Sequence, residues 1–279
     1  MIRNRSVTIL QLRNYSGVVI GLGILFTMLL AAFVAPLPYD PFKPDGYSVL
    51  LPPSSAHWFG TDLTGFDVFS RTIVSARLDL PLAIGGALVS MIVGVTLGLL
   101  ASAKGRLGES MMRALDAFQA FPLLILAIAI VSISGNRLEN VVIAIAVINI
   151  PRFMRLVRSE VLSLRESRFA EAAIAIGATK ARLMFRHLLP NLTGIILAQV
   201  SIAAAHAIIV IAALSFLGIG ITPPDASWGA MIQSGARNMI SGQWWVAAFP
   251  GMAVVIAVAS LNLIADGLDD IVNRSVGDA

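Results

Sequence analysis

Residues 140–158, NVVIAIAVINIPRFMRLVR, decide how many times this chain crosses a membrane. The first twelve residues carry no charge, but three arginines follow within the next seven. A helix needs about 20 mostly apolar residues to cross a hydrocarbon core about 30 Å thick. The stretch therefore spans only if one helix continues through Pro151 to about Val157, with the long arginine side chains reaching toward the interface.

Five other stretches are long and apolar enough to cross without such help. They are Gly17–Leu37, Pro81–Ala103, Leu115–Ser134, Leu188–Leu217 and Trp244–Ala265. The whole chain is 57% hydrophobic and 13% charged, with a mean hydropathy of +0.84, whereas soluble domains are about 25% charged. This composition excludes a disordered chain and a nucleic-acid-binding domain, and it disfavours a soluble enzyme. The absence of cysteine excludes disulfides, thiol catalysis and thiolate metal sites.

The placement of lysine and arginine predicts the orientation. With six spans, fifteen of the twenty basic residues lie on the same side as residues 1–16, and five lie on the other side. Without the span at 140–158, the eight basic residues between 152 and 187 would face outward, against the positive-inside rule. The sequence therefore predicts an all-α membrane protein with six transmembrane helices and both termini in the cytoplasm.

These spans divide the chain into four parts. They are a cytoplasmic N-terminal segment (1–16), a first helix with its outer segment (17–79), a five-helix core (80–266) and a cytoplasmic tail (267–279). A basic N-terminus before an apolar run is also typical of a signal peptide, whose apolar region usually has 7–15 residues. The run here is longer and no clean cleavage site follows it, so we expect a retained anchor.

Ionisable residues are rare inside the spans, which narrows the mechanism. His206 is a candidate for lining a transport pathway; the alternative is a neutral imidazole bonded to a neighbouring helix. A stand-alone ion-coupled carrier would normally bury charged groups near the midplane, so that class is disfavoured. A membrane-embedded hydrolase is disfavoured too, because Ser201 and His206 lie five positions apart and point to different helix faces. No phosphate-binding loop and no metal-binding histidine pair occur in the sequence.

Residues 158–191, RSEVLSLRESRFAEAAIAIGATKARLMFRHLLPN, form a long basic loop on the cytoplasmic side. We expect it to be helical with one break at Gly177, where glycine allows a turn. Alanines before the break make a smooth surface, and Pro190 marks the start of the next span. Such a helix suits the groove of another protein. Attraction to anionic lipid alone would explain the basic residues but not the alanine-rich surface.

This loop resembles the EAA loop of membrane subunits in ATP-binding-cassette importers. The motif reads Glu171-Ala172-Ala173, then Gly177, then nine residues later His187-x-Leu189-Pro190. The string RHLLPN is similar to the dipeptide/oligopeptide/nickel branch, and further likenesses at 57–80, 112–124, 214–229 and 262–270 extend over nearly the whole chain. The second-subunit type of the peptide permeases (DppC/OppC-like) is the most similar. Three positions depart from the usual residues: Phe66, Ala265 and Asp269.

The resemblance implies a type I importer permease in the bacterial inner membrane, without catalytic activity of its own. It implies a second homologous permease subunit, two separate ATPases that bind ATP and magnesium, and an extracytoplasmic binding protein; the chain itself needs no cofactor. Coupling to the ATPases would run through the loop at about 158–190, at Glu171, Ala172, Ala173, Gly177, His187, Leu189 and Pro190.

The outer segments 38–79 and 218–243 would dock the binding protein in such a system. Asp225 and Trp228 are candidates there, and an ordinary amphipathic loop is the alternative for both. Di- and oligopeptides are the most frequent cargo of this branch. Nickel, opines, glutathione and other small solutes remain alternatives, because selectivity is expected mainly from the binding protein.

Overall fold

The computed structural model describes residues 3–103, 105–221 and 224–277, and its regular structure in these ranges is helical. Seven longer helices carry the fold: α1 Arg3–Val34, α2 Val68–Ala101, α3 Arg106–Gln119, α4 Leu123–Ser134, α5 Leu138–Arg165, α9 Thr193–Phe216 and α11 Trp245–Gly277. Six short elements connect them: α6 Arg168–Ala175, α7 Lys180–Arg182, η1 Leu183–Leu188, α8 Leu189–Asn191, α10 Trp228–Ala236 and η2 Met239–Ser241.

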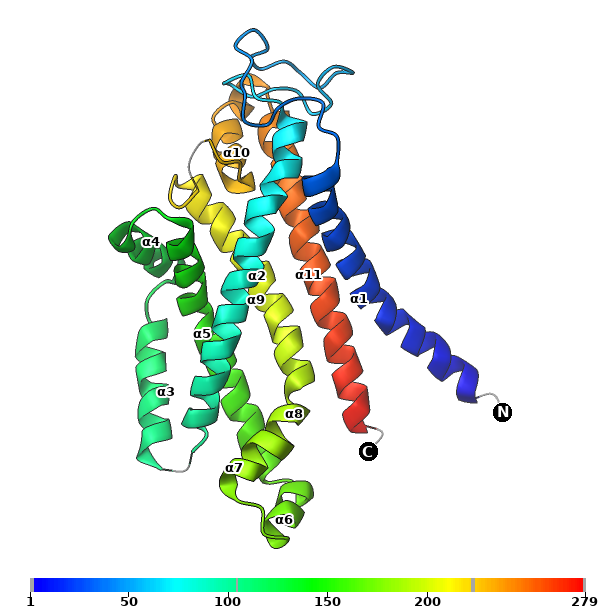
Figure 1. Cartoon of the computed structure of the whole chain (residues 1–279), viewed down its shortest axis with the longest axis vertical. Helices are drawn as coiled ribbons and strands as arrows, with labels where there is room; N and C mark the ends of the chain where they lie inside the picture. The colour runs from blue at the N-terminus through cyan, green and yellow to red at the C-terminus, as the bar shows by residue number, and fades with distance from the viewer. Residues whose placement is uncertain (1–2, 104, 222–223, 278–279) are drawn as a thin grey trace.

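Five of the described helices are long and apolar enough to cross a membrane, and the bent pair α3–α4 gives a sixth crossing if it is counted as one span. The decisive stretch at 140–158 is confirmed as a span, since α5 continues through Pro151 to Arg165. Both ends of the chain lie at the same end of the molecule as α6 and α7, and the long loop before α2 lies at the opposite end (Figure 1). This arrangement agrees with an even number of crossings.

The third span differs from the sequence prediction. Instead of one helix over 115–134, α3 ends at Gln119 and α4 begins at Leu123, with a bend of 87° between them. Pro122 explains the break, because a proline disfavours helical backbone in the residue before it. The proline was visible in the sequence, but its effect was not included in the prediction.

Three other boundaries also lie elsewhere than predicted. The segment 1–16 is helical from Arg3 onward and continues directly into the first span. Helix α2 starts at Val68, so the outer segment ends near residue 67 rather than 79. The Asp67 carboxylate explains this start, because it accepts a hydrogen bond from the Ser70 amide at 2.8 Å and caps the helix. Helix α11 continues through most of the expected tail at 267–279.

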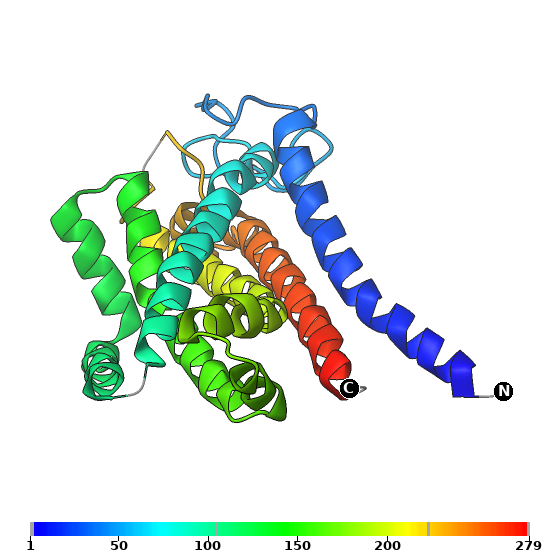
Figure 2. The ribbon, with the colours of Figure 1, turned by 60° about the horizontal axis from the view of Figure 1, so that its bottom comes forward.

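Glycines allow the closest helix contacts of the core. A Cβ at Gly94 would lie 2.5 Å from the Cβ of Phe153, and one at Gly98 would lie 2.8 Å from the Met154 carbonyl oxygen, so α2 and α5 pack with little space between their backbones. Gly21 brings α1 equally close to Ser260 of α11. Helix α1 follows α11 near its outer end and diverges from it toward the N-terminus (Figure 2).

Candidate functional site

The loop between α5 and α9 contains helix α6, and residues next to this helix in the sequence cap both of its ends. At the start, the Ser167 hydroxyl accepts a hydrogen bond from the amide three residues on, at 3.3 Å. At the end, Gly177 takes a left-handed conformation with φ +85°. Its amide donates to the Ile174 carbonyl at 2.9 Å and the Ala178 amide donates to the Ala173 carbonyl at 3.0 Å, which together form a Schellman motif. Gly177 therefore determines where α6 ends, as its motif position predicted.

Helix α6 has one face in the core and one face outside. Ala173 is 4% exposed and packs with Leu183 and Leu188 in a small apolar cluster. It cannot contact a partner in this conformation, so its expected place on the coupling surface is corrected. The reason is helical periodicity, which turns Ala173 inward while Glu171 and Ala172 stay exposed.

Three exposed apolar side chains extend this surface, and sequence reasoning did not select them. Ile174 is 55% exposed, Ile176 is 85% exposed and Phe185 is 63% exposed. Exposed apolar side chains on a loop become candidates for a partner contact when they form a contiguous patch. The available signal was the presence of large apolar residues within a segment already predicted to face the cytoplasm. We call the exposed set Glu171, Ala172, Ile174, Ile176, Gly177 and Phe185 the coupling surface.

The second half of the motif forms a widened helical turn. In η1, Leu183–Leu188, the helix is π-helical, and the Leu189 amide donates to the carbonyl five residues back. Pro190 has no amide hydrogen to continue an ordinary helix, and the Asn191 side-chain amide instead donates to the His187 carbonyl at 2.6 Å. His187 and Leu189 are half-buried and Pro190 is exposed. These residues shape the loop's return to the membrane.

At the opposite end of the molecule, Trp228 is buried rather than available for docking. Its side chain is 1% exposed, its amide donates to the Asp79 carboxylate at 2.9 Å and its indole NH donates to the Thr72 carbonyl at 2.9 Å. The prediction that Trp228 contacts a binding protein is therefore wrong for this conformation, because α2 covers it. The early start of α2, which the sequence prediction missed, brings Asp79 and Thr72 to this position.

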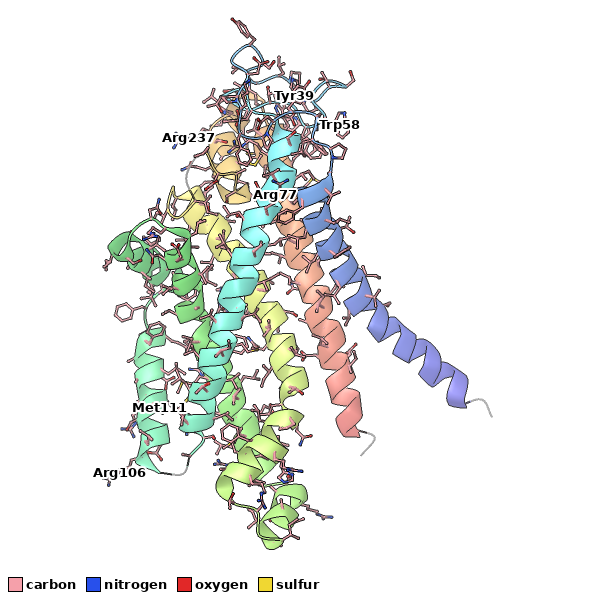
Figure 3. The ribbon with its side chains drawn as sticks, viewed as in Figure 1. Tyr39, Trp58, Arg77, Arg106, Met111 and Arg237 are labelled. Carbon is pink, nitrogen blue, oxygen red and sulfur yellow. The ribbon has the colours of Figure 1, made fainter. Side chains whose placement is uncertain are left out.

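Asp225 lies on the exposed loop before α10, and its carbonyl accepts a hydrogen bond from the Arg71 guanidinium at 3.4 Å. Side-chain contacts also hold the neighbouring outer segment together. His57 stacks on Tyr39 with ring centroids 4.3 Å apart, and its Nδ1 atom lies 3.0 Å from the Asp67 carboxylate. Tyr39 lies at this outer end together with Trp58 and Arg237, far from α6 (Figure 3). The outer surface is thus folded, with Asp225 accessible on it.

The hydrogen bonds of Asp45 also hold this outer segment. Its carboxylate accepts from the Ser48 hydroxyl at 2.7 Å and from the Tyr47 amide at 3.0 Å. These bonds lower the pKa of Asp45, the bond from Ser48 most strongly, because they stabilise the ionised carboxylate. The loop is therefore organised by a carboxylate that favours its charged form.

The arginines after Pro151 do not all reach toward the interface as the sequence predicted. Arg155 lies 2.8 Å from Asp116 of α3, and Arg158 donates to the Gly108 carbonyl at 2.6 Å, so both reach sideways and hold α3 against α5. Arg152 instead donates to Asn149 of its own helix at 3.0 Å. Arg155 and Arg158 therefore bind the first half of the bent third span. They could not make these contacts if they extended to the interface.

His206 is half-buried at the centre of α9. Its Nδ1 atom is buried and has no hydrogen-bond partner among the described residues. Ser201 donates to the Leu197 carbonyl of its own helix at 3.4 Å, which is no arrangement for a serine nucleophile and a histidine base. His206 therefore remains the candidate for lining the transport pathway.

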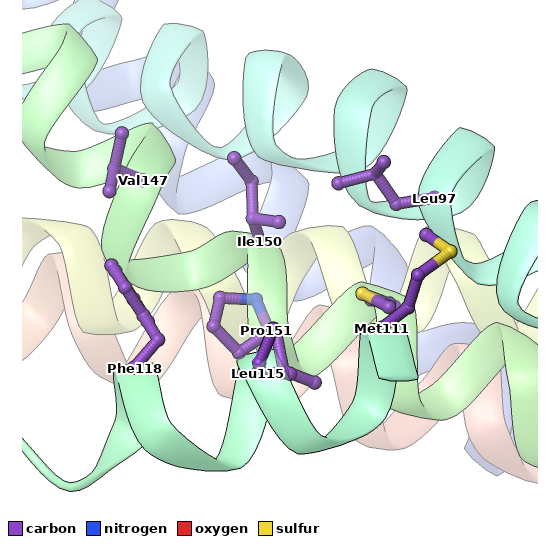
Figure 4. Close-up of a pocket in the computed structure, with 9 residues that line it drawn as sticks. Leu97, Met111, Leu115, Phe118, Val147, Ile150 and Pro151 are labelled. Atoms are coloured by element: carbon purple, nitrogen blue, oxygen red, sulfur yellow. The ribbon is translucent and has the colours of Figure 1, made fainter. Parts of the chain in front are cut away.

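A cavity of about 330 Å³ lies between α2, α3 and α5 (Figure 4). Its lining is apolar and includes Leu97, Met111, Phe118, Ile150 and Pro151. Figure 3 places Met111 on the inner half of α3, close to Arg106 at the start of that helix. With no charged side chain in its lining, this cavity is unsuited to a charged solute.

Residues 86–278 match the protein family described as "Binding-protein-dependent transport system inner membrane component". The chain belongs to this family. The dipeptide transport system permease protein DppC of Alkalihalophilus pseudofirmus is 42% identical, over 93% of this chain and 86% of that relative. The glutathione transport system permease protein GsiD of Pectobacterium atrosepticum is 40% identical, over 93% of this chain and 87% of the relative.

A solved structure shares the fold of this binding-protein-dependent permease. It is the methionine ABC transporter MetNI in inward-facing conformations, with a TM-score of 0.59 and 17% identity, over 74% of this chain and 96% of that chain. The resemblance to ATP-binding-cassette importer permeases is thereby confirmed, and so is the all-α multi-pass fold. The chain is a membrane-embedded permease subunit of an importer.

Proposed function

We propose that this permease forms half of a peptide pathway in the bacterial inner membrane, receives its cargo from an extracytoplasmic binding protein and is driven by two separate ATPases. The named relatives support peptide cargo, since they include permeases of dipeptide and D,D-dipeptide transport systems. A second homologous permease subunit would complete the pathway. In this scheme ATP and magnesium bind only to the ATPases, and the chain itself has no catalytic role.

The observation that carries the coupling role is the exposed face of a helix capped at both ends. Ser167 and Gly177 hold α6 in place, so the helix keeps its shape without a partner. Its outer face presents a carboxylate, a small alanine and two isoleucines. This combination fits a groove on a partner, because apolar contacts supply affinity and Glu171 supplies orientation.

Mechanistically, coupling requires that the ligands prefer different conformations. ATP and the loaded binding protein would shift an equilibrium between inward-open and outward-open states by their different affinities for the two. Helix α6 packs on α5 and η1 through the cluster around Val161 and Leu188, so a push on the coupling surface would move α5 and the start of α9. Rocking of helix bundles around a central site would then alternate access.

The test combines Glu171→Lys and Gly177→Pro with uptake of a labelled dipeptide in cells lacking the native permease. We expect both variants to insert normally and to lose uptake, because the first reverses the charge of the coupling surface and the second destroys the cap of α6. Wild-type uptake by both variants would contradict the coupling role. As a control, Gly46→Ala changes an outer glycine with open space around it and should leave uptake unchanged.

Orientation and partners need separate tests. Cysteines introduced at Ser55 and Ser163, both exposed at opposite ends, can be labelled in this cysteine-free chain with an impermeant reagent. We expect labelling from outside only at Ser55. Labelling at Ser163 from outside would contradict the predicted orientation.

Co-purification should recover two ATPases and a second permease, and purification of the chain alone would favour a stand-alone carrier.

Glutathione is the second candidate cargo, favoured by the 40% identity to a glutathione permease. The outer docking surface near Asp225 does not discriminate between the two cargoes, because in either case it would contact the binding protein and not the solute. Binding measurements on the binding protein that co-purifies with the importer or supports its uptake, with dipeptides and glutathione in parallel, decide between them.

A further inference from the structure

Arg152 lies inside a membrane-spanning helix of this chain. Arg152 follows Pro151 near the middle of α5, and its neighbour Phe153 packs against Gly94 of α2. Gly94 is nine residues from the inner end of the uncharged run Pro81–Ala103, which corresponds to roughly 13 Å of helix. The backbone of Arg152 is therefore within the hydrocarbon region and not at its edge.

The side chain of Arg152 points away from the nearer, cytoplasmic interface. Its Nη1 donates to Asn149 Oδ1 at 3.0 Å, and Asn149 is three residues closer to the outer end of α5. Asn149 is fully buried and donates in turn to the Ile145 carbonyl at 3.0 Å. The guanidinium is thus held toward the membrane centre by a fixed amide, whereas an arginine near a helix end normally extends to the interface.

No acidic side chain within the described residues forms an ion pair with Arg152, although Arg155 of the same helix has Asp116. A charged side chain at this depth is costly, and it is tolerated where it faces a water-filled cavity or binds an anionic group. With only one of its five NH groups used on a side chain, the guanidinium retains donors for such a group.

The face of α9 that carries His206 is the second component. His206 is half-buried, and Ile202 and Ile209, one helical turn to each side, are 38% and 51% exposed, so the described residues cover this stripe only in part. Helices α5 and α9 pack against each other, so the spans that carry Arg152 and His206 are neighbours in the bundle. His206 Nδ1 is buried and has no partner among the described residues.

We propose that Arg152, oriented by Asn149 and assisted by His206, binds a carboxylate of the transported solute within the pathway. Guanidinium and carboxylate match geometrically, because two parallel NH groups can bind both oxygens. A peptide carries such a group at its C-terminus. The inference rests on the proposed import function and specifies which chemical group of the cargo this subunit recognises.

The test uses the complete importer in proteoliposomes with its loaded binding protein, and it measures both dipeptide uptake and ATP hydrolysis. We expect Arg152→Gln to lower uptake at least tenfold while stimulation of ATP hydrolysis by the loaded binding protein stays within twofold of wild type. Arg152→Lys should recover part of the uptake, since the charge is kept. Arg137→Gln, an exposed arginine at the outer end of the same helix, should behave as wild type.

The outcomes separate this inference from the proposed function. Wild-type uptake by Arg152→Gln overturns the carboxylate site and leaves import intact, and so does equal loss of uptake and of stimulated hydrolysis, which indicates a structural role. If Arg152→Gln does not assemble, His206→Leu decides in the same assay: reduced uptake with normal hydrolysis supports the site, and normal uptake overturns it. A wild-type complex that takes up no dipeptide contradicts the proposed cargo itself.

Discussion

Two short helices, α6 at the cytoplasmic end and α10 at the outer end, are held in place by different means. Helix α6 depends on residues next to it in the sequence: the Ser167 cap and the Gly177 turn. Helix α10 depends on distant residues: Asp79 accepts from its first amide across 149 positions, and Gly229 and Gly235 bring it against α9 and α11.

The difference explains what each helix can do. The coupling surface of α6 is exposed and apolar, and its local caps let it keep its shape when a partner binds or leaves. Helix α10 has its first residue fully buried, so it moves only together with α2 and α9. We infer that α6 transmits force to α5 through its buried face, while α10 closes the outer end as part of the core.

The largest expected effect comes from removing the anchor of α10. Trp228→Ala should lower the free energy of unfolding by about 3–5 kcal/mol, because it empties a fully buried site and removes the indole hydrogen bond. Thermal unfolding of the purified permease measures this. The control is Trp58→Ala, at an outer tryptophan that is 56% exposed. An equal loss of stability in both variants would contradict the anchoring role of the buried Trp228.

The next effect tests the long-range bond to α10. Asp79→Ala should cost about 1–3 kcal/mol, since the buried Trp228 amide loses its acceptor. Asp79→Asn keeps an acceptor oxygen and should cost less. Thermal unfolding with protease accessibility of residues 224–243 reports both; equal loss in the two variants would show that the charge, and not the hydrogen bond, anchors the helix.

A smaller effect is expected at the end of α6. Gly177→Ala should cost about 1–2 kcal/mol locally, because alanine is strained in the left-handed conformation. The permease should unfold at nearly the wild-type temperature, while binding-protein-stimulated ATP hydrolysis falls severalfold. Unchanged hydrolysis would show that the coupling surface tolerates a displaced helix end.

The smallest effect concerns the start of α6. Ser167→Ala should cost about 1 kcal/mol of helix stability through loss of the cap, and Ser167→Asp should restore it. Hydrogen exchange of residues 168–176 is the measurement, since faster exchange confined to α6 is expected. Faster exchange that spreads to α5 or α9 would contradict the local character of this helix.

The elements that the sequence predicted correctly depend on local or additive properties. The apolar spans followed from apolar length, which requires no knowledge of contacts. Their direction, inferred from the summed placement of basic residues, stays a prediction. The break at Gly177 followed from glycine's access to left-handed backbone. The bend before α4 was predictable in the same way from Pro122, and the prediction failed only because the apolar run was treated as one helix.

The sequence by itself determined that the chain is a multi-pass helical membrane protein with a motif that resembles a coupling loop, because hydropathy and turn chemistry act over a few residues. The tertiary structure alone decided that Ala173 and Trp228 are buried and that Asp79 anchors α10. It also placed the helix that carries His206 beside the helix that carries Arg152. The physical reason is that burial and pairing depend on which helices are neighbours, and residues as far apart in the sequence as Thr61 and Trp245, 184 positions, meet only when the bundle has closed.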